Sequence, residues 1–128
     1  MPKKRILRHI FRVHGFMNSL QFAGKGVLYL FLYHRNMRLI FLMGLLALLS
    51  GFYFKVTVLE WVILCITVTL VFIAEIFNTA IEMLMGMLRA RYYLRIKLIK
   101  DIAAAVVLLA SLNAIVVGLV IFISRIKR

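Results

Sequence analysis

Acidic side chains are rare in this sequence, and most of them fall close together. Of the four in the chain, Glu75, Glu82 and Asp101 lie at the ends of two long apolar segments. Glu75, Asn78 and Glu82 are three and four residues apart, a spacing that places them along one face of a helix. Such carboxylate and amide oxygens can accept a proton and can coordinate Mg²⁺, which usually binds together with phosphates. The pattern predicts a polar site for acid–base chemistry and metal binding.

Each acid also has a purely structural interpretation. Glu75 follows an apolar run, so its carboxylate must face protein or water, where it could pair with an arginine of another helix. Glu82 could be a solvated carboxylate, and we expect Glu60 to be one. Asp101 could cap a helix beside a snorkelling Lys100, although a lysine at a helix start is also well placed for a nucleotide phosphate.

The rest of the sequence is strongly apolar. Hydrophobic residues make up 65% of the 128 positions, and the mean hydropathy is +1.03, which excludes an ordinary soluble domain. The single proline is Pro2, so the apolar segments can form unbroken helices. A membrane span needs roughly 20 apolar residues. We predict an all-α membrane protein, one domain over residues 1–128, with transmembrane helices at about 39–54, 56–77 and 102–124.

The N-terminal segment, residues 1–36, has a different pattern. Ile6, Ile10, Val13, Met17 and Leu20 recur at steps of four and three, and basic residues occupy much of the opposite face. This periodicity predicts an amphipathic helix on the membrane surface. A more apolar piece, residues 22–33, is expected to lead from that helix into the first span.

The basic residues predict how the chain is oriented in the membrane. The net charge is +13, but the basic residues flank apolar spans, which indicates anionic lipid head groups instead of nucleic acid. Thirteen of them precede the first span or lie between the second and third, against four elsewhere. The positive-inside rule therefore places the N-terminus and the 83–101 connection in the cytoplasm and the C-terminus outside.

Small residues recur along one side of the third span. Ala103, Ala110, Ala114 and Gly118 allow close approach of another helix, which predicts contact between copies of the chain. The alternative is that alanine and glycine are simply common in transmembrane helices.

Two polar segments have distinctive sequences: residues 74–82 read AEIFNTAIE, and residues 100–110 read KDIAAAVVLLA. Together they resemble the motifs of a known family, the small bacterial integral-membrane diacylglycerol kinases and undecaprenol kinases. Residues 18–38, with Gly26, Asn36 and Arg38 in register, also look like the family's surface helix and its approach to the first span. The resemblance implies a homotrimeric lipid kinase of the bacterial plasma membrane, with active sites shared between subunits at the cytoplasmic interface.

The resemblance also implies roles for individual residues. ATP with Mg²⁺ would be the phosphoryl donor and a lipid hydroxyl the acceptor. Glu75 would be the catalytic base, Glu82 would hold Mg²⁺, and Asn78 would support the site. Lys100 and Asp101 would contribute to nucleotide binding.

Two positions depart from the family pattern. The register from Gly26 and Arg38 places His34 where the family usually has a second metal-binding glutamate. Gly86 replaces the aspartate that commonly follows four residues after the second motif glutamate. Histidine is a poorer partner for Mg²⁺ than a carboxylate, so the departures bear on metal affinity and on activity.

Other functions remain open beside an active kinase. A catalytically weakened family member could bind lipid or a partner protein, and a small transporter could use Glu75 as a proton relay. The transporter gives no role to Lys100 and Asp101. The acceptor could be undecaprenol or diacylglycerol, and the sequences RNMR at 35–38 and KDIAAA at 100–105 look more like undecaprenol kinases.

Overall fold

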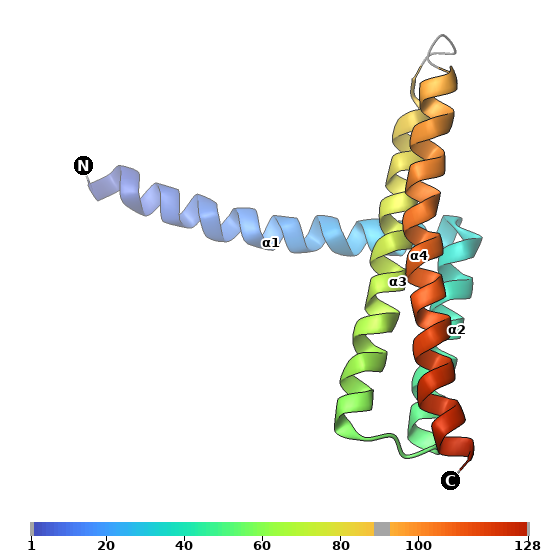
Figure 1. Cartoon of the computed structure of the whole chain (residues 1–128). Coiled ribbons are helices and arrows are strands. Elements are labelled where there is room, and N and C mark those ends of the chain that lie inside the picture. Colours follow the sequence, from blue (N-terminus) through green and yellow to red (C-terminus); the bar gives the residue numbers. More distant parts are fainter. Residues whose placement is uncertain (1, 89–92, 128) are drawn as a thin grey trace. The chain divides into compact units, whose positions relative to one another are not determined.

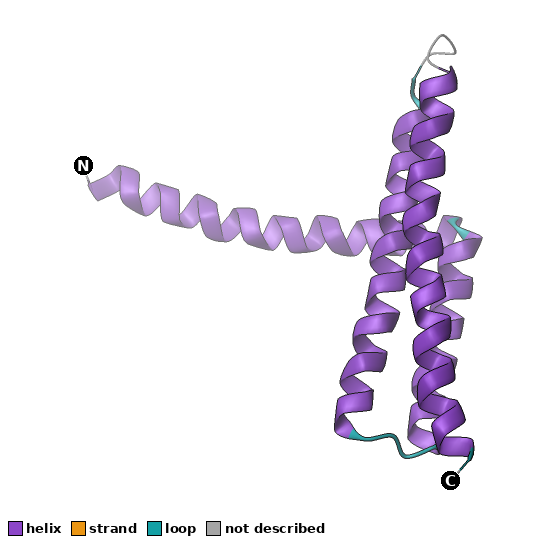
Figure 2. Ribbon diagram, viewed as in Figure 1, coloured by secondary structure: helices purple, strands orange, loops and turns teal. Residues whose placement is uncertain are grey.

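The computed structural model describes the backbone of residues 2–88 and 93–127, with side chains from residue 15 onward in those ranges. The described chain is helical apart from short connections (Figure 2). Its helices are α1 (Pro2–Tyr33), α2 (Arg35–Tyr53), α3 (Val58–Gly86) and α4 (Tyr93–Ile126). The predicted all-α class is confirmed. Residues 1–35 and 36–128 form two separate compact units.

In the first unit, α1 is a single helix of 32 residues. We expected a surface helix followed by a distinct second piece, but the helix continues through Gly24 and Gly26. A glycine inside a helix costs about 1 kcal/mol relative to alanine, which is too little to break a long helix. The rings of Tyr29 and Tyr33 lie 4.9 Å apart near its end. The amphipathic surface role of α1 stays a prediction.

In the second unit, α2, α3 and α4 are each long and apolar enough to cross a membrane. The three predicted spans correspond to these helices to within two residues at the α2–α3 connection, and at their other ends the helices extend beyond the spans. The 29 residues of α3 are about 44 Å long by the helical rise, against a hydrocarbon thickness of about 30 Å. Counting consecutive apolar residues finds only the part of a helix that lipid covers. The predicted second span therefore ended at 77 and the predicted third span began at 102, although the helices continue beyond these residues. The polar ends remain helical.

The most extensive helix contact in the described chain joins α3 and α4, which run antiparallel and side by side (Figure 1). Small residues allow this approach. Ala103 of α4 and Ala74 of α3 are both 3% exposed, and Ala110, Ala114 and Gly118 line hollows shared with α3. These are the residues that we predicted would contact another copy of the chain. Ala103 is buried within the chain, whereas the other three line hollows beside α3, so contact between copies stays a prediction.

Two glycines bring α2 against α3. A Cβ added to Gly44 would lie 2.9 Å from Cγ1 of Val68, and one added to Gly51 would lie 3.1 Å from the ring of Trp61. The glycines are seven residues apart and therefore share a helix face. Beside them, the rings of Phe52 and Trp61 lie 4.6 Å apart. Close packing at these points fixes where α2 meets α3.

The connection between α2 and α3 is short and tightly held. Lys55 has a φ of 52°, and Thr57 caps α3 by accepting a hydrogen bond from the backbone N–H of Glu60 at 3.2 Å. Buried Val56 and Leu64 pack with Ile121 of α4 in a cluster that closes this end of the unit.

The carboxylate of Glu60 joins this end to α4. We expected Glu60 to be solvated, and that expectation was wrong: it pairs with Arg125, with Nη2 2.5 Å from Oε1 and Nε 3.4 Å from Oε2. The two side chains are only 23% and 16% exposed, respectively. The pair holds the start of α3 to the end of α4.

Candidate active site

Glu75 is the one buried acid of the chain, since all four acids lie in the described residues. It is 6% exposed on α3, beside Ala74 and one turn before Thr79, which is 4% exposed. Burying a carboxylate within an apolar helix is costly, and such groups are usually retained for function. Of the two surroundings that we expected for this carboxylate, protein or water, its burial favours protein, and it makes Glu75 the centre of the candidate site.

Asn78 follows one turn after Glu75 on the same helix. Its Oδ1 atom is buried and accepts no hydrogen bond from any residue that the structure describes. A buried acceptor left unsatisfied costs about 1–3 kcal/mol, so it is expected to meet a partner in the working protein. A substrate hydroxyl or a cation is such a partner. The oxygen donors of this face therefore fit Mg²⁺, whose preferred ligands are oxygens.

Glu82, Lys100 and Asp101 are exposed, and the register of α3 and α4 brings them to one level. Phe77 of α3 and Val106 of α4 line the same groove. Glu82 lies five residues after Phe77 on α3, and Asp101 lies five residues before Val106 on α4. Because the helices are antiparallel, Glu82 and Asp101 therefore lie at the same level. The two sequence motifs therefore meet at one end of the α3–α4 pair.

Among the described residues, the ion pairs near this level do not involve Lys100. Asp101 accepts a hydrogen bond from Nζ of Lys97 at 3.4 Å, an exposed contact one turn back along α4. In the described residues no carboxylate is paired with Lys100. Its ammonium group can therefore bind a phosphate without first breaking an ion pair.

His34 belongs to the N-terminal unit. Its backbone N–H donates to the carbonyl of Leu30 at 2.9 Å, and its ring lies 5.9 Å from that of Tyr29. The described residues hold no group of three or more His, Cys, Asp or Glu side chains placed to bind a metal ion. A magnesium ion bound with phosphates needs only one or two protein carboxylates. The metal roles of His34 and Glu82 stay predictions.

The structure adds Thr79 to the residues that the sequence singled out. Thr79 is buried four residues after Glu75, on the same face of α3. That spacing alone would have pointed to it. Gly86, the second departure from the family pattern, has nothing within 4 Å of an added Cβ, so a larger side chain fits there.

Comparison with known proteins identifies the family. The sequence model of the family described as prokaryotic diacylglycerol kinase matches residues 21–122, which include every candidate site residue. The chain belongs to this family of lipid kinases, and the resemblance of its motifs is confirmed.

Two curated relatives carry kinase names. An undecaprenol kinase of Bacillus subtilis is 26% identical over 117 residues, which cover 91% of this chain and 95% of the relative. A diacylglycerol kinase of Synechocystis sp. is 33% identical over 101 residues, 78% of this chain but only 58% of the relative. No solved structure matches the chain.

Proposed function

We propose that the protein transfers the γ-phosphoryl group of ATP, with Mg²⁺, to the hydroxyl of a membrane lipid alcohol at the cytoplasmic membrane interface. The observation that carries this proposal is the buried carboxylate of Glu75, followed one turn later by the unsatisfied Oδ1 of Asn78. Membership in a lipid kinase family supplies the reaction class. The proposed base, Glu75, and its proposed polar partner, Asn78, share one face of α3.

The length of α3 supports a site near the membrane interface. Glu75 lies 17 residues after Val58, which is about 26 Å along the helix. In a hydrocarbon layer of about 30 Å, a helix that begins at one boundary therefore carries this carboxylate to just inside the other. Glu82 stands about 10 Å further out, where water and nucleotide reach it. A lipid hydroxyl and ATP would meet between these two levels.

In the proposed reaction, the Glu75 carboxylate accepts the proton of the lipid hydroxyl. The hydroxyl oxygen forms a bond to the γ-phosphorus, and the bond from that phosphorus to the bridging oxygen breaks, leaving ADP. Asn78 and Thr79 orient the hydroxyl, and Lys100 and Asp101 hold the nucleotide. Bound Mg²⁺ would neutralise phosphate charge, which with positioning supplies most of the catalysis in phosphoryl transfer.

We assign Glu82 to the metal, and in the register of the family motif His34 occupies the sequence position of the usual second metal-binding glutamate. Histidine binds Mg²⁺ weakly. A His34→Glu variant is therefore expected to lower the Mg²⁺ concentration needed for half-maximal activity. If the metal requirement does not change, His34 has no part in binding it.

The assembly that we propose is a homotrimer with the N-terminus and the 83–101 connection in the cytoplasm, the C-terminus outside, and residues 1–36 on the membrane surface. Within an 18-residue apolar stretch of α4, only 6% is buried inside the chain. Asn113, in the middle of this span, is exposed, and an amide in hydrocarbon gains from a hydrogen bond to another helix. Both features favour contact with further copies.

Undecaprenol is the acceptor that we favour over diacylglycerol. The sequences RNMR at 35–38 and KDIAAA at 100–105 look more like those of undecaprenol kinases. The relative named undecaprenol kinase also aligns over 95% of its length. Purified protein assayed in mixed micelles with ATP, Mg²⁺ and each alcohol decides between the two.

The same assay tests the proposed base. Glu75→Gln keeps the shape of the side chain but removes the base, and a decrease in kcat of about 10²- to 10⁴-fold is expected. Glu82→Gln is the matched control: it should raise the Mg²⁺ requirement while activity returns at saturating metal. The competing function is a catalytically weakened, lipid-binding member of the family, favoured by His34 and Gly86. It predicts no turnover of either lipid by the unmodified protein.

A further inference from the structure

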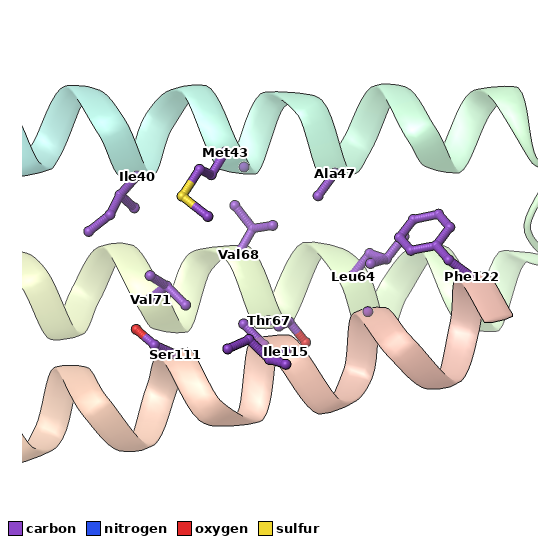
Figure 3. A pocket seen from close by; sticks show the side chains of 13 residues that line it. Ile40, Met43, Ala47, Leu64, Thr67, Val68, Val71, Ser111, Ile115 and Phe122 are labelled. Carbon is purple, nitrogen blue, oxygen red and sulfur yellow. The ribbon is translucent and has the colours of Figure 1, made fainter.

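A cavity of about 280 Å³ lies among the three helices of the second unit. Figure 3 shows Ile40 and Met43 of α2 facing Val68 and Val71 of α3 across it. α4 lines it with Ile115 and Phe122 and with the small residues Ala114 and Gly118, which leave space beside them.

The lining offers almost nothing to a polar ligand. The hydroxyl of Thr67 already donates to the carbonyl of Ile63 at 2.7 Å, and Ser111 is the one other lining residue with a polar side chain. Apolar cavities of about 150 Å³ stay dry and bind small hydrocarbons, so this larger one suits a hydrocarbon occupant.

The position of the cavity relates it to the candidate active site. One end is at Val71, a single helical turn from Glu75. The other end is at Leu64 and Phe122, where the buried cluster around Val56 begins. The cavity therefore runs along the helices, away from the carboxylate, and ends against packed side chains.

We propose that this cavity binds the hydrocarbon chain of the lipid alcohol whose hydroxyl reacts at Glu75. The inference rests on the proposed function and assigns a binding site to the part of the substrate that does not react. The hydroxyl stands at the carboxylate, and the first carbons of the chain lie between α2 and the α3–α4 pair.

The register of α3 and α4 gives the length of hydrocarbon chain that would extend from Glu75 to Gly118. Leu70 of α3 and Asn113 of α4 line one groove, so they lie at about the same level. Gly118 follows Asn113 by five residues, and because the helices are antiparallel it is level with the α3 position five residues before Leu70. That level is about 15 Å from the level of Glu75 by the helical rise. An extended hydrocarbon with bonds of about 1.5 Å needs about a dozen carbons to reach it. Long-chain acceptors reach Gly118, and short-chain acceptors do not.

Gly118 is the position at which to test this. A Cβ added there meets nothing within 4 Å, so Gly118→Leu fills the far half of the cavity without striking the backbone. Val120→Phe is the matched control, because Val120 lies two residues away on α4 and is 66% exposed. Each variant of the full chain is assayed in mixed micelles with a short and a long acceptor: dihexanoylglycerol and dioleoylglycerol, or geraniol and undecaprenol.

For Gly118→Leu, we expect KM to rise about tenfold for the long acceptor, as expected from losing about two buried methylenes. KM for the short acceptor and for ATP should not change, which also shows that the variant is folded. Val120→Phe should leave KM unchanged for both the short and the long acceptor. An unchanged KM for the long acceptor, or an equal loss for both acceptors, overturns the inference. So does a change in oligomer size, because it would assign the cavity to a second copy of the chain.

A binding measurement separates this inference from the proposed function. Trp61, the one tryptophan in the chain, packs against the cluster at the far end of the cavity. A distearoylglycerol brominated at mid-chain, added at low mole fraction, should quench its fluorescence in the unmodified protein and less in Gly118→Leu. Quenching without turnover overturns the kinase function and keeps the site. Turnover with equal quenching in both proteins overturns the site and keeps the kinase.

Discussion

The docking of α2 on α3 gives a prediction whose size follows from the structure. In Gly44→Ala the new Cβ would lie 2.9 Å from Cγ1 of Val68, where ordinary contacts are 3.4–4 Å. Val68 is β-branched and has one strongly preferred rotamer in a helix, so it cannot turn aside easily. The strain must be relieved by moving α2 away from α3.

Two opposing terms set the magnitude. Alanine is favoured over glycine inside a helix by about 1 kcal/mol, and overpacking a close contact costs about 1–3 kcal/mol. Gly118→Ala is the matched control, because its Cβ meets nothing within 4 Å. It should therefore gain the first term without the second. The free energy of unfolding should be about 1–3 kcal/mol lower for Gly44→Ala than for Gly118→Ala.

The measurement is reversible unfolding of the two variants in mixed micelles, titrated with a denaturing detergent and followed by circular dichroism. Equal free energies of unfolding for the two variants would refute the reasoning, because they would show that α2 does not approach α3 as closely as the structure places it. A decrease in both variants of similar size would refute it as well.

Three further predictions follow from other contacts. Glu60→Gln and Arg125→Gln should each lower Tm more than the double variant does, because each leaves a half-buried charge without its partner; additive effects would show that the pair is not coupled. Asp101→Asn should raise KM for ATP without changing Tm, since its pair with Lys97 is exposed; a lower Tm would assign Asp101 a structural role. Asn113→Leu should weaken association between copies by about 0.5–2 kcal/mol, the range for polar contacts between membrane helices, measured by sedimentation in detergent; unchanged association would place Asn113 outside the interface.

The helices and the site face could be predicted because their signals are local. The spacing of Glu75, Asn78 and Glu82 depends only on helical geometry, and α3 is helical throughout that stretch. The burial of Thr79 follows from the same geometry. The full length of α3 did not follow from the apolar count, because helical hydrogen bonding continues into the head-group layer where apolar side chains are no longer required.

The contacts between helices could not be predicted in the same way. Glu60 and Arg125 are 65 residues apart, and only the antiparallel register of α3 and α4 brings them together. The small residues Ala110 and Gly118 indicated a close helix partner but could not say whether that partner was in the same chain. Local patterns show which face a helix will pack, and the fold determines what it packs against.

The docking of α2 has a consequence for the order of assembly in the membrane. The extensive helix contact is between α3 and α4, and α2 meets α3 most closely at Gly44 and Gly51. Synthesis delivers α2 to the bilayer first, before the surface on which it docks exists. α2 must therefore remain in lipid as an independent helix until α3, which is made after it, has entered the bilayer and presents Val68 and Trp61 to its two glycines.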